Sequence, residues 1–162
     1  MVVNNKALMT VIVLWWLCSL IVARVLLEMP FVIPLLEAVR EAIPAVQKCA
    51  RGAPNPLAIA PFYVFFMLTT PIVAVWYSRY TELKRPLTLP VTVIMWLLIP
   101  GCVFYMTIGI DVSEVRSHGF RRTLYLVMNS SWFGSSFIFL LFCHCLIFAA
   151  VCLFRNKARR FS

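Results

Sequence analysis

Acidic residues are scarce in this chain, which has six aspartates and glutamates among 162 residues. Charged residues of both signs make up 13% of the sequence and apolar residues 62%, whereas an ordinary soluble domain is about 45–50% apolar. A soluble fold of this size leaves much of its surface in water and could not hide so much apolar area. The composition therefore excludes an ordinary water-soluble domain and favours a protein whose helices face lipid.

Residues that carry chemistry are scarce as well. His144 is the one ionisable candidate deep within an apolar run. Its neighbours Cys143 and Cys145 point about 100° away from it on a helix, so the three side chains cannot share one metal ion. The sequence has no phosphate-binding glycine loop, no dinucleotide fingerprint and no H-E-x-x-H motif, and no buried His–Asp pair accompanies a nucleophile. We therefore expect no enzyme, no metal site and no cofactor.

The cysteine pattern does not predict a disulfide framework. Five of the six cysteines lie inside apolar runs, where cysteine is a small apolar filler. Cys49 is in a polar segment, without a partner on that side of the membrane.

Four apolar runs are long enough to cross a bilayer, which takes about 20 helical residues. They cover residues 7–27, 57–77, 87–110 and 124–154. The first is long for a secretion signal and is followed by no small-residue cleavage site, so we interpret it as an uncleaved signal anchor. The sequence predicts an all-α integral membrane protein in which residues 1–162 form one four-helix transmembrane bundle.

The basic residues indicate the orientation of these helices. With the N-terminus inside, eight of the 15 basic residues fall in three short cytoplasmic segments, and seven are spread over about twice that length outside. Short, densely basic segments dominate the positive-inside rule, so we expect both termini in the cytoplasm. The basic residues form no single stripe, which argues against nucleic acid as a partner and for contact with lipid headgroups. The orienting residues are Lys6, Arg79, Lys84, Arg85, Arg155, Lys157, Arg159 and Arg160.

The first outer connection contains an amphipathic helix at about residues 31–47. Apolar residues recur there at helical spacing, with charged residues between them. Pro34 is placed to open this helix and Pro44 to end or kink it. The helix lies on the outer membrane surface or caps the bundle, and the pattern does not separate a packing role from contact with a partner. The apolar positions are Val32, Leu35, Leu36, Val39, Ile43 and Val46.

Small and hydroxyl residues mark candidate helix contacts in two of the spans. In lipid, small residues let helices approach closely, and serine or asparagine can hydrogen-bond across the contact. Such a surface can bind the protein's own helices, which we expect more often, or a foreign transmembrane helix. Pro100, followed by Gly101, also predicts a bend in the third span. The contact candidates are Gly101, Asn129, Ser130, Ser131, Gly134, Ser135 and Ser136.

The layout resembles that of the immunity proteins of pore-forming bacteriocins of the colicin A type. The likeness lies in the long first outer connection, the short basic inner connection (residues 78–86) and the basic tail after the fourth span. Residues 55–57 before the second span, and Arg122, Leu124 and Asn129 leading into the fourth, are similarly placed. The proline-rich outer segment and the tryptophan density are departures from the family, and they leave open which toxin is recognised.

The resemblance implies a function that needs helix surfaces and no catalytic group. A family member sits in the bacterial inner membrane and binds the spanning helices of a pore-forming toxin before voltage opens the channel. The alternative is a small accessory or exclusion protein of a conjugation or secretion machine. A channel or transporter is disfavoured because the spans have no buried charges and show no inverted repeat. The sequence does not indicate the oligomeric state.

Overall fold

The computed structural model describes residues 2–3, 5–51, 55–82, 86–109, 119 and 132–160, with side chains for 9–51, 55–79, 86–109, 119 and 134–157. Four long helices dominate it, and each has the length and apolar composition needed to cross a membrane. The predicted all-α, multi-pass membrane fold is confirmed. The helices are α1 (Asn5–Glu28), α4 (Ile59–Tyr80), α5 (Leu89–Thr107) and α7 (Trp132–Arg160).

The third and fourth helices end at other residues than the predicted spans, and a proline and a glycine mark the two ends of the third. The third span, predicted at 87–110, is the shorter helix α5, which runs through Pro100 and Gly101 without interruption. Pro90 lies in the first turn of α5, where its missing N–H costs nothing, and Gly109 follows the helix at a φ of 68°. The fourth span, predicted at 124–154, continues to Arg160, and its first part, 124–131, is outside the described residues.

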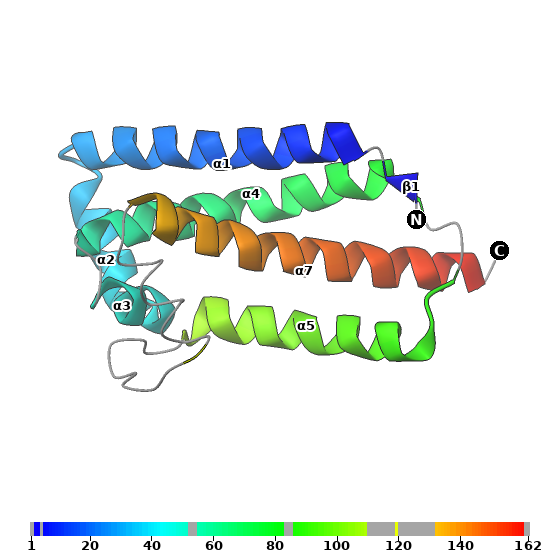
Figure 1. The fold of residues 1–162 in the computed structure, drawn as a ribbon. Helices are drawn as coiled ribbons and strands as arrows, with labels where there is room; N and C mark the ends of the chain where they lie inside the picture. The colour runs from blue at the N-terminus through cyan, green and yellow to red at the C-terminus, as the bar shows by residue number, and fades with distance from the viewer. Residues whose placement is uncertain are drawn as a thin grey trace.

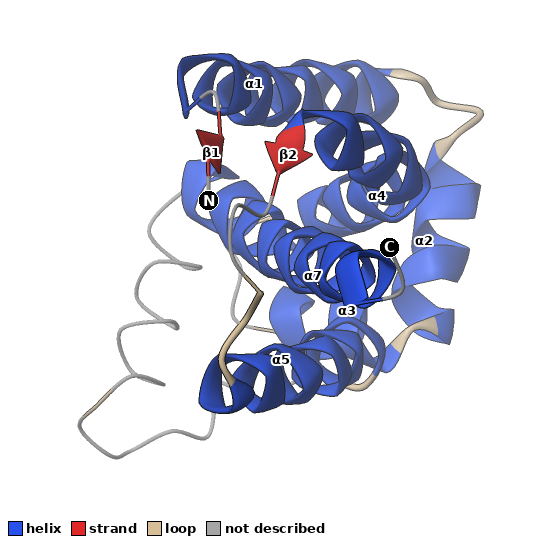
Figure 2. Cartoon of the chain, turned by 90° about the vertical axis from the view of Figure 1, so that its right-hand side faces the viewer, coloured by secondary structure: helices blue, strands red, loops and turns tan. Residues whose placement is uncertain are grey.

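The long helices lie side by side, with α7 in the centre (Figures 1 and 2). Helix α4 packs against both α1 and α7, and α1 makes a smaller contact with α7. Helix α5 lies on the other flank of α7, which is its main neighbour, and also contacts α3. The arrangement therefore leaves α5 at the edge of the group.

Two short helices, α2 (Ile33–Ala42) and α3 (Pro44–Ala50), cross one end of the long helices (Figure 1). The helix predicted at 31–47 is divided at Ile43, whose extended backbone (φ −108°, ψ 110°) precedes Pro44, the residue predicted to end or kink it. Leu36 and Val46 are buried against the long helices, so the pair caps the bundle. Leu35, predicted on the same apolar side, is 64% exposed, because it lies about 100° around the helix from Leu36. A 3-10 turn, η1 (Pro56–Ala58), leads from this cap into α4.

The opposite end of the molecule gathers both termini and the connection between α4 and α5 (Figure 1). Strand β1 (Val2–Val3) pairs antiparallel with β2 (Thr81–Glu82). Two neighbouring residues at the end of α7 hold the ends of the same connection. Arg155 donates to the carbonyl of Ser78, and the side-chain oxygen of Asn156 accepts from the backbone N–H of Leu87 at 3.0 Å.

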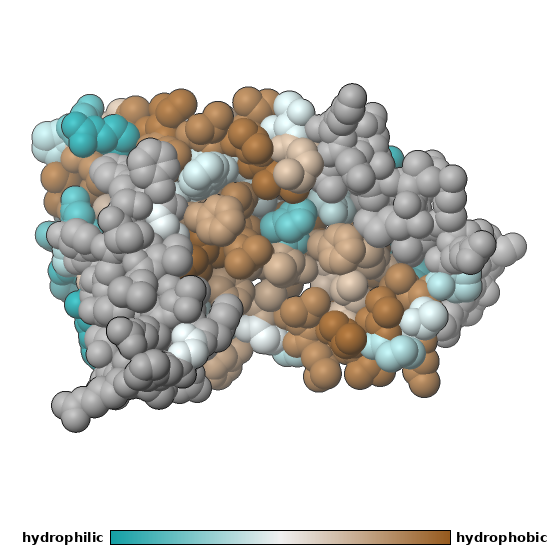
Figure 3. All heavy atoms as spheres, in the orientation of Figure 1, coloured by the Kyte–Doolittle hydropathy of each residue, from teal (hydrophilic) through white to brown (hydrophobic). Residues whose placement is uncertain are grey.

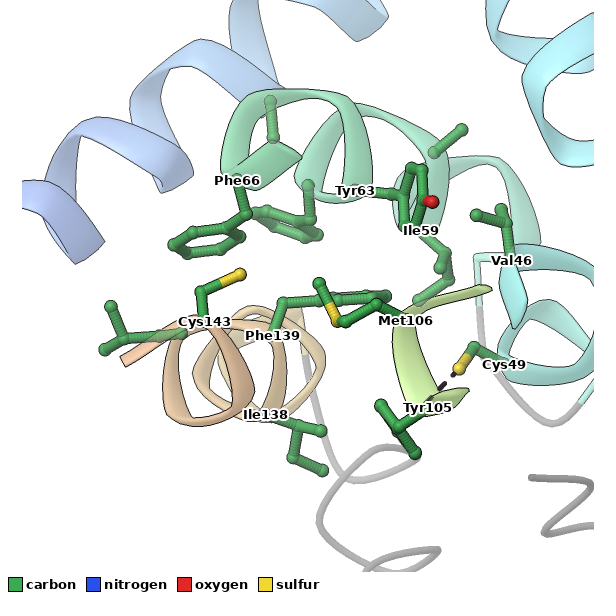
Figure 4. Close-up of a cluster of buried hydrophobic side chains, with 14 of the residues drawn as sticks. Val46, Cys49, Ile59, Tyr63, Phe66, Tyr105, Met106, Ile138, Phe139 and Cys143 are labelled. Carbon is green, nitrogen blue, oxygen red and sulfur yellow. Dashed lines mark hydrogen bonds between the residues drawn. The ribbon is translucent and has the colours of Figure 1, made fainter. Parts of the chain in front are cut away.

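The protein presents apolar side chains both inside and outside. Figure 3 shows apolar residues across the middle of one face, where the long helices run, and hydrophilic residues toward the end that carries α2. The interior is an aromatic and aliphatic cluster between α4, α5 and α7 (Figure 4). In it, the rings of Tyr63 on α4 and Phe139 on α7 meet edge-on with their centroids 6.1 Å apart. The hydroxyl oxygen of Tyr105 on α5 lies 4.0 Å from the sulfur of Cys49 on α3. Exposed apolar area of this extent suits a lipid environment.

Candidate helix-docking surface

The small residues predicted in the fourth span are used inside the protein. Gly134, Ser135 and Ser136 occupy the beginning of α7 and are all buried. The hydroxyl of Ser136 accepts a hydrogen bond from the indole N–H of Trp16 at 2.8 Å, which joins α7 to α1. These residues therefore serve contact among the protein's own helices. The remaining candidates of this stretch, Asn129, Ser130 and Ser131, lie outside the described residues.

Two adjacent tryptophans hold α1 against two different helices. Trp15 donates its indole N–H to the hydroxyl of Thr69 on α4 at 2.8 Å, and its ring meets Phe66 edge-on at 5.1 Å. Trp16 reaches α7 instead, because neighbouring side chains on a helix diverge by about 100°. The sequence alone does not predict these hydroxyl partners, because Thr69 and Ser136 lie 54 and 120 residues away from the tryptophans that they contact.

The orienting basic residues that the structure describes collect at the end that holds the termini. Lys6 lies in the first turn of α1, and Arg79 is exposed in the last turn of α4. Arg155 and Lys157 lie near the end of α7, and the backbone of residues 159–160 completes that helix. Lys84 and Arg85 are outside the described residues. Those of the orienting residues that the structure describes thus share one end of the molecule.

Helix α5 has one covered and one open side. Cys102, Tyr105 and Met106 are buried toward its neighbours, and the Tyr105 ring stacks on Phe142 of α7 at 3.8 Å. Six residues at alternating spacings of four and three follow the opposite side, which we call the outer face of α5, and every one of them is exposed. No charged residue occurs anywhere in this helix. The outer face consists of Leu89, Val93, Trp96, Pro100, Val103 and Thr107.

A groove opens beside Gly101, between α5 and α7. Its volume is ≈ 380 Å³, and an added Cβ at Gly101 would meet no atom within 4 Å. Gly101, a predicted helix-contact residue, is exposed and not packed against another helix among the described residues. The position instead leaves room for a helix of another molecule to approach the backbone of α5. The groove is lined by Ile94, Leu97, Leu98, Gly101, Cys102 and Phe142.

His144 is an aromatic packing partner in this structure. Its ring meets that of Tyr77 on α4 edge-on at 5.9 Å. Within the described part of the chain, no group of three histidine, cysteine, aspartate or glutamate side chains is placed to hold a metal ion.

The outer face of α5 presents hydrocarbon, the indole of Trp96 and the hydroxyl of Thr107. Such a surface is suited to binding in lipid.

Comparison with known proteins adds no relative. No protein-family model matches the sequence, and no curated protein or solved structure is significantly similar to it.

Proposed function

We propose that this chain is an immunity protein of the bacterial inner membrane, which binds the transmembrane helices of a pore-forming bacteriocin before the channel opens. The observation that carries the proposal is the open, uncharged surface of α5, with its outer face and the groove beside Gly101. A surface of this kind binds other helices and needs no catalytic group. The proposed protein therefore acts by contact alone.

The toxin and the proposed immunity protein meet within the bilayer. A pore-former inserts a hydrophobic helical hairpin, so the part of it that must be held is surrounded by lipid. Lipid tails are as apolar as leucine, and helices associate there through close packing and hydrogen bonds. The groove beside Gly101 favours such packing, because Gly101 itself has no side chain to hold an incoming helix away from the backbone of α5.

The proposed orientation places both termini in the cytoplasm, because the densely basic short segments lie at their end of the molecule. Helices α2 and α3 then face the periplasm, from which a pore-former arrives. Phe31 and Leu35, which are 79% and 64% exposed, add apolar surface at this end.

The proposal is tested by expressing the protein in a bacterial strain that is sensitive to pore-forming bacteriocins. We expect the strain to survive one pore-former, or a closely related few, and to retain its membrane potential when that toxin is added. A bacteriocin that kills by degrading nucleic acid is the control and should kill the strain as before. Sensitivity to every pore-former of a broad panel, with reduced receipt of plasmids in mating, would support an exclusion protein instead.

A further inference from the structure

Trp96 occupies an unusual place on the outer face of α5. The helix has 19 residues, a length of about 28 Å, which roughly equals the thickness of the hydrocarbon core. Trp96 is two residues from the central residue, Leu98, and is 62% exposed. Tryptophan is enriched at the membrane interfaces, where water and headgroups satisfy its N–H. Here the indole projects from the protein near the middle of the bilayer.

The indole N–H of Trp96 has no hydrogen-bond acceptor among the described residues. Lipid tails offer none either, so the donor is left unsatisfied at a cost. The two tryptophans of α1 show how this protein treats the same group elsewhere. Trp15 and Trp16 each donate to a hydroxyl at 2.8 Å.

We propose that a transmembrane helix of another protein docks along the outer face of α5 and presents a hydroxyl or carboxamide side chain at the level of Trp96. That side chain accepts the hydrogen bond of the indole. Val93 and Val103, which are 48% and 45% exposed, supply the apolar packing on either side. This inference rests on the proposed function to the extent that it identifies the docking helix with one of the toxin's.

Neither lipid nor the side chains of a second copy of the chain accept the hydrogen bond of this indole. An acyl chain has no acceptor. In a dimer related by a two-fold axis along the membrane normal, each residue faces residues of its own depth. The outer face would then bring Val93, Trp96 and Pro100 of the copy opposite Trp96, and none of these three side chains accepts a hydrogen bond.

The test uses synthetic leucine-rich helices of about 20 residues, with lysines at both ends and either threonine or valine at the centre. Threonine and valine have nearly the same shape, so the pair isolates the hydroxyl. The protein, labelled with a donor dye, is reconstituted in phosphatidylcholine vesicles, and energy transfer to acceptor-labelled peptide measures binding. Wild type is compared with Trp96→Phe and with Trp16→Phe, which removes an indole N–H from the interior.

We expect wild type to prefer the threonine peptide by about three- to tenfold, the size of a hydrogen bond between membrane helices. Trp96→Phe should bind both peptides equally, whereas Trp16→Phe should keep the preference. Equal binding of both peptides by wild type would overturn the inference, as would a preference that survives in Trp96→Phe. Energy transfer between two labelled copies of the protein that is lost in Trp96→Phe would show that a second copy occupies the face.

The peptide measurement needs no toxin, so its failure can be told apart from failure of the proposed function. Protection without a threonine preference would remove the role of Trp96 and leave the immunity function in place. A threonine preference without protection would keep the docking face and remove the toxin as its occupant.

Discussion

The indole nitrogen of Trp16 lies 2.8 Å from the hydroxyl oxygen of Ser136, so residues 120 apart in sequence are joined by one hydrogen bond. The bond links α1 to the beginning of α7. Trp16 also meets Phe137 edge-on at 5.9 Å, so the hydrogen bond and the ring contact support the same helix pair.

Ser136→Ala removes the acceptor and leaves the indole N–H buried beside α7. We expect a loss of about 0.5–2 kcal/mol in the free energy of unfolding, the usual range for hydrogen bonds between membrane helices. The measurement is unfolding in mixed micelles of increasing SDS fraction, followed by circular dichroism. Cys145→Ala is the control, because Cys145 is half-buried on the same helix and has no hydrogen bond among the described residues. A smaller loss in Ser136→Ala than in the control would contradict the structural role of the bond.

Gly109 is held where no other residue fits. Its φ is 68°, and an added Cβ would lie 2.6 Å from the Cα of Ala45 on α3. Gly109→Ala should therefore destabilise the protein by more than about 2 kcal/mol, since the left-handed backbone alone costs about 1–2 kcal/mol. Gly101→Ala is the matched control: its Cβ meets nothing within 4 Å, and alanine is the better helix former by about 0.5–1 kcal/mol. Equal stability of the two variants would show that α3 does not pack against the end of α5.

How much of this protein could be read from its sequence depends on the question. The four helices were predictable because crossing the hydrocarbon requires a long apolar run, and α5 consists of almost nothing else. Which side of α5 is covered was not predictable, because apolar residues surround it evenly. Gly101 and Ser136 looked alike as small residues. The structure buries Ser136 beneath Trp16 and leaves Gly101 open.

Helix α2 shows the same limit at a smaller scale, because its end could be predicted but its buried side could not. Pro44 predicted a break there, because a proline disfavours the helical conformation of the residue before it. The pattern alone did not separate Leu35 from Leu36 as outward and inward residues. That choice depends on where α4 lies beneath α2, which is a tertiary contact between segments distant in the sequence.

Asn156 provides a test of the end that holds the termini. It is 5% exposed, and its side-chain oxygen accepts the N–H of Leu87 just before α5. Asn156→Leu should lower the free energy of unfolding by about 1–3 kcal/mol, because it leaves that N–H without its partner. Lys157→Ala, at the exposed neighbouring position, should change it by less than about 0.5 kcal/mol. Both are measured by thermal unfolding in detergent; a stable Asn156→Leu variant would mean that Leu87 finds another acceptor.

The proposed orientation can be tested by labelling. Single cysteines are introduced as Ala38→Cys on α2 and Arg79→Cys at the end of α4, both exposed, in a background whose six cysteines are replaced by alanine. A maleimide that cannot cross membranes should label position 38 in intact spheroplasts and position 79 only after lysis. The reverse pattern would place the termini in the periplasm and contradict the proposed topology.

Filling the groove beside Gly101 tests whether it is used in toxin binding. Gly101→Leu puts a side chain into the groove of ≈ 380 Å³ between α5 and α7, where its Cβ meets no atom within 4 Å and the rest of the side chain blocks an approaching helix. Ala150→Leu on α7 is the control, because it adds the same side chain type at another exposed position. We expect both variants to fold and unfold like wild type in SDS-containing micelles, and cells with Ala150→Leu to remain protected. Gly101→Leu should lower by at least about tenfold the toxin concentration at which cells die, equivalent to about 1.4 kcal/mol of lost binding. Full protection by Gly101→Leu would exclude the groove as the docking site and leave the outer face of α5 as the remaining candidate on that helix.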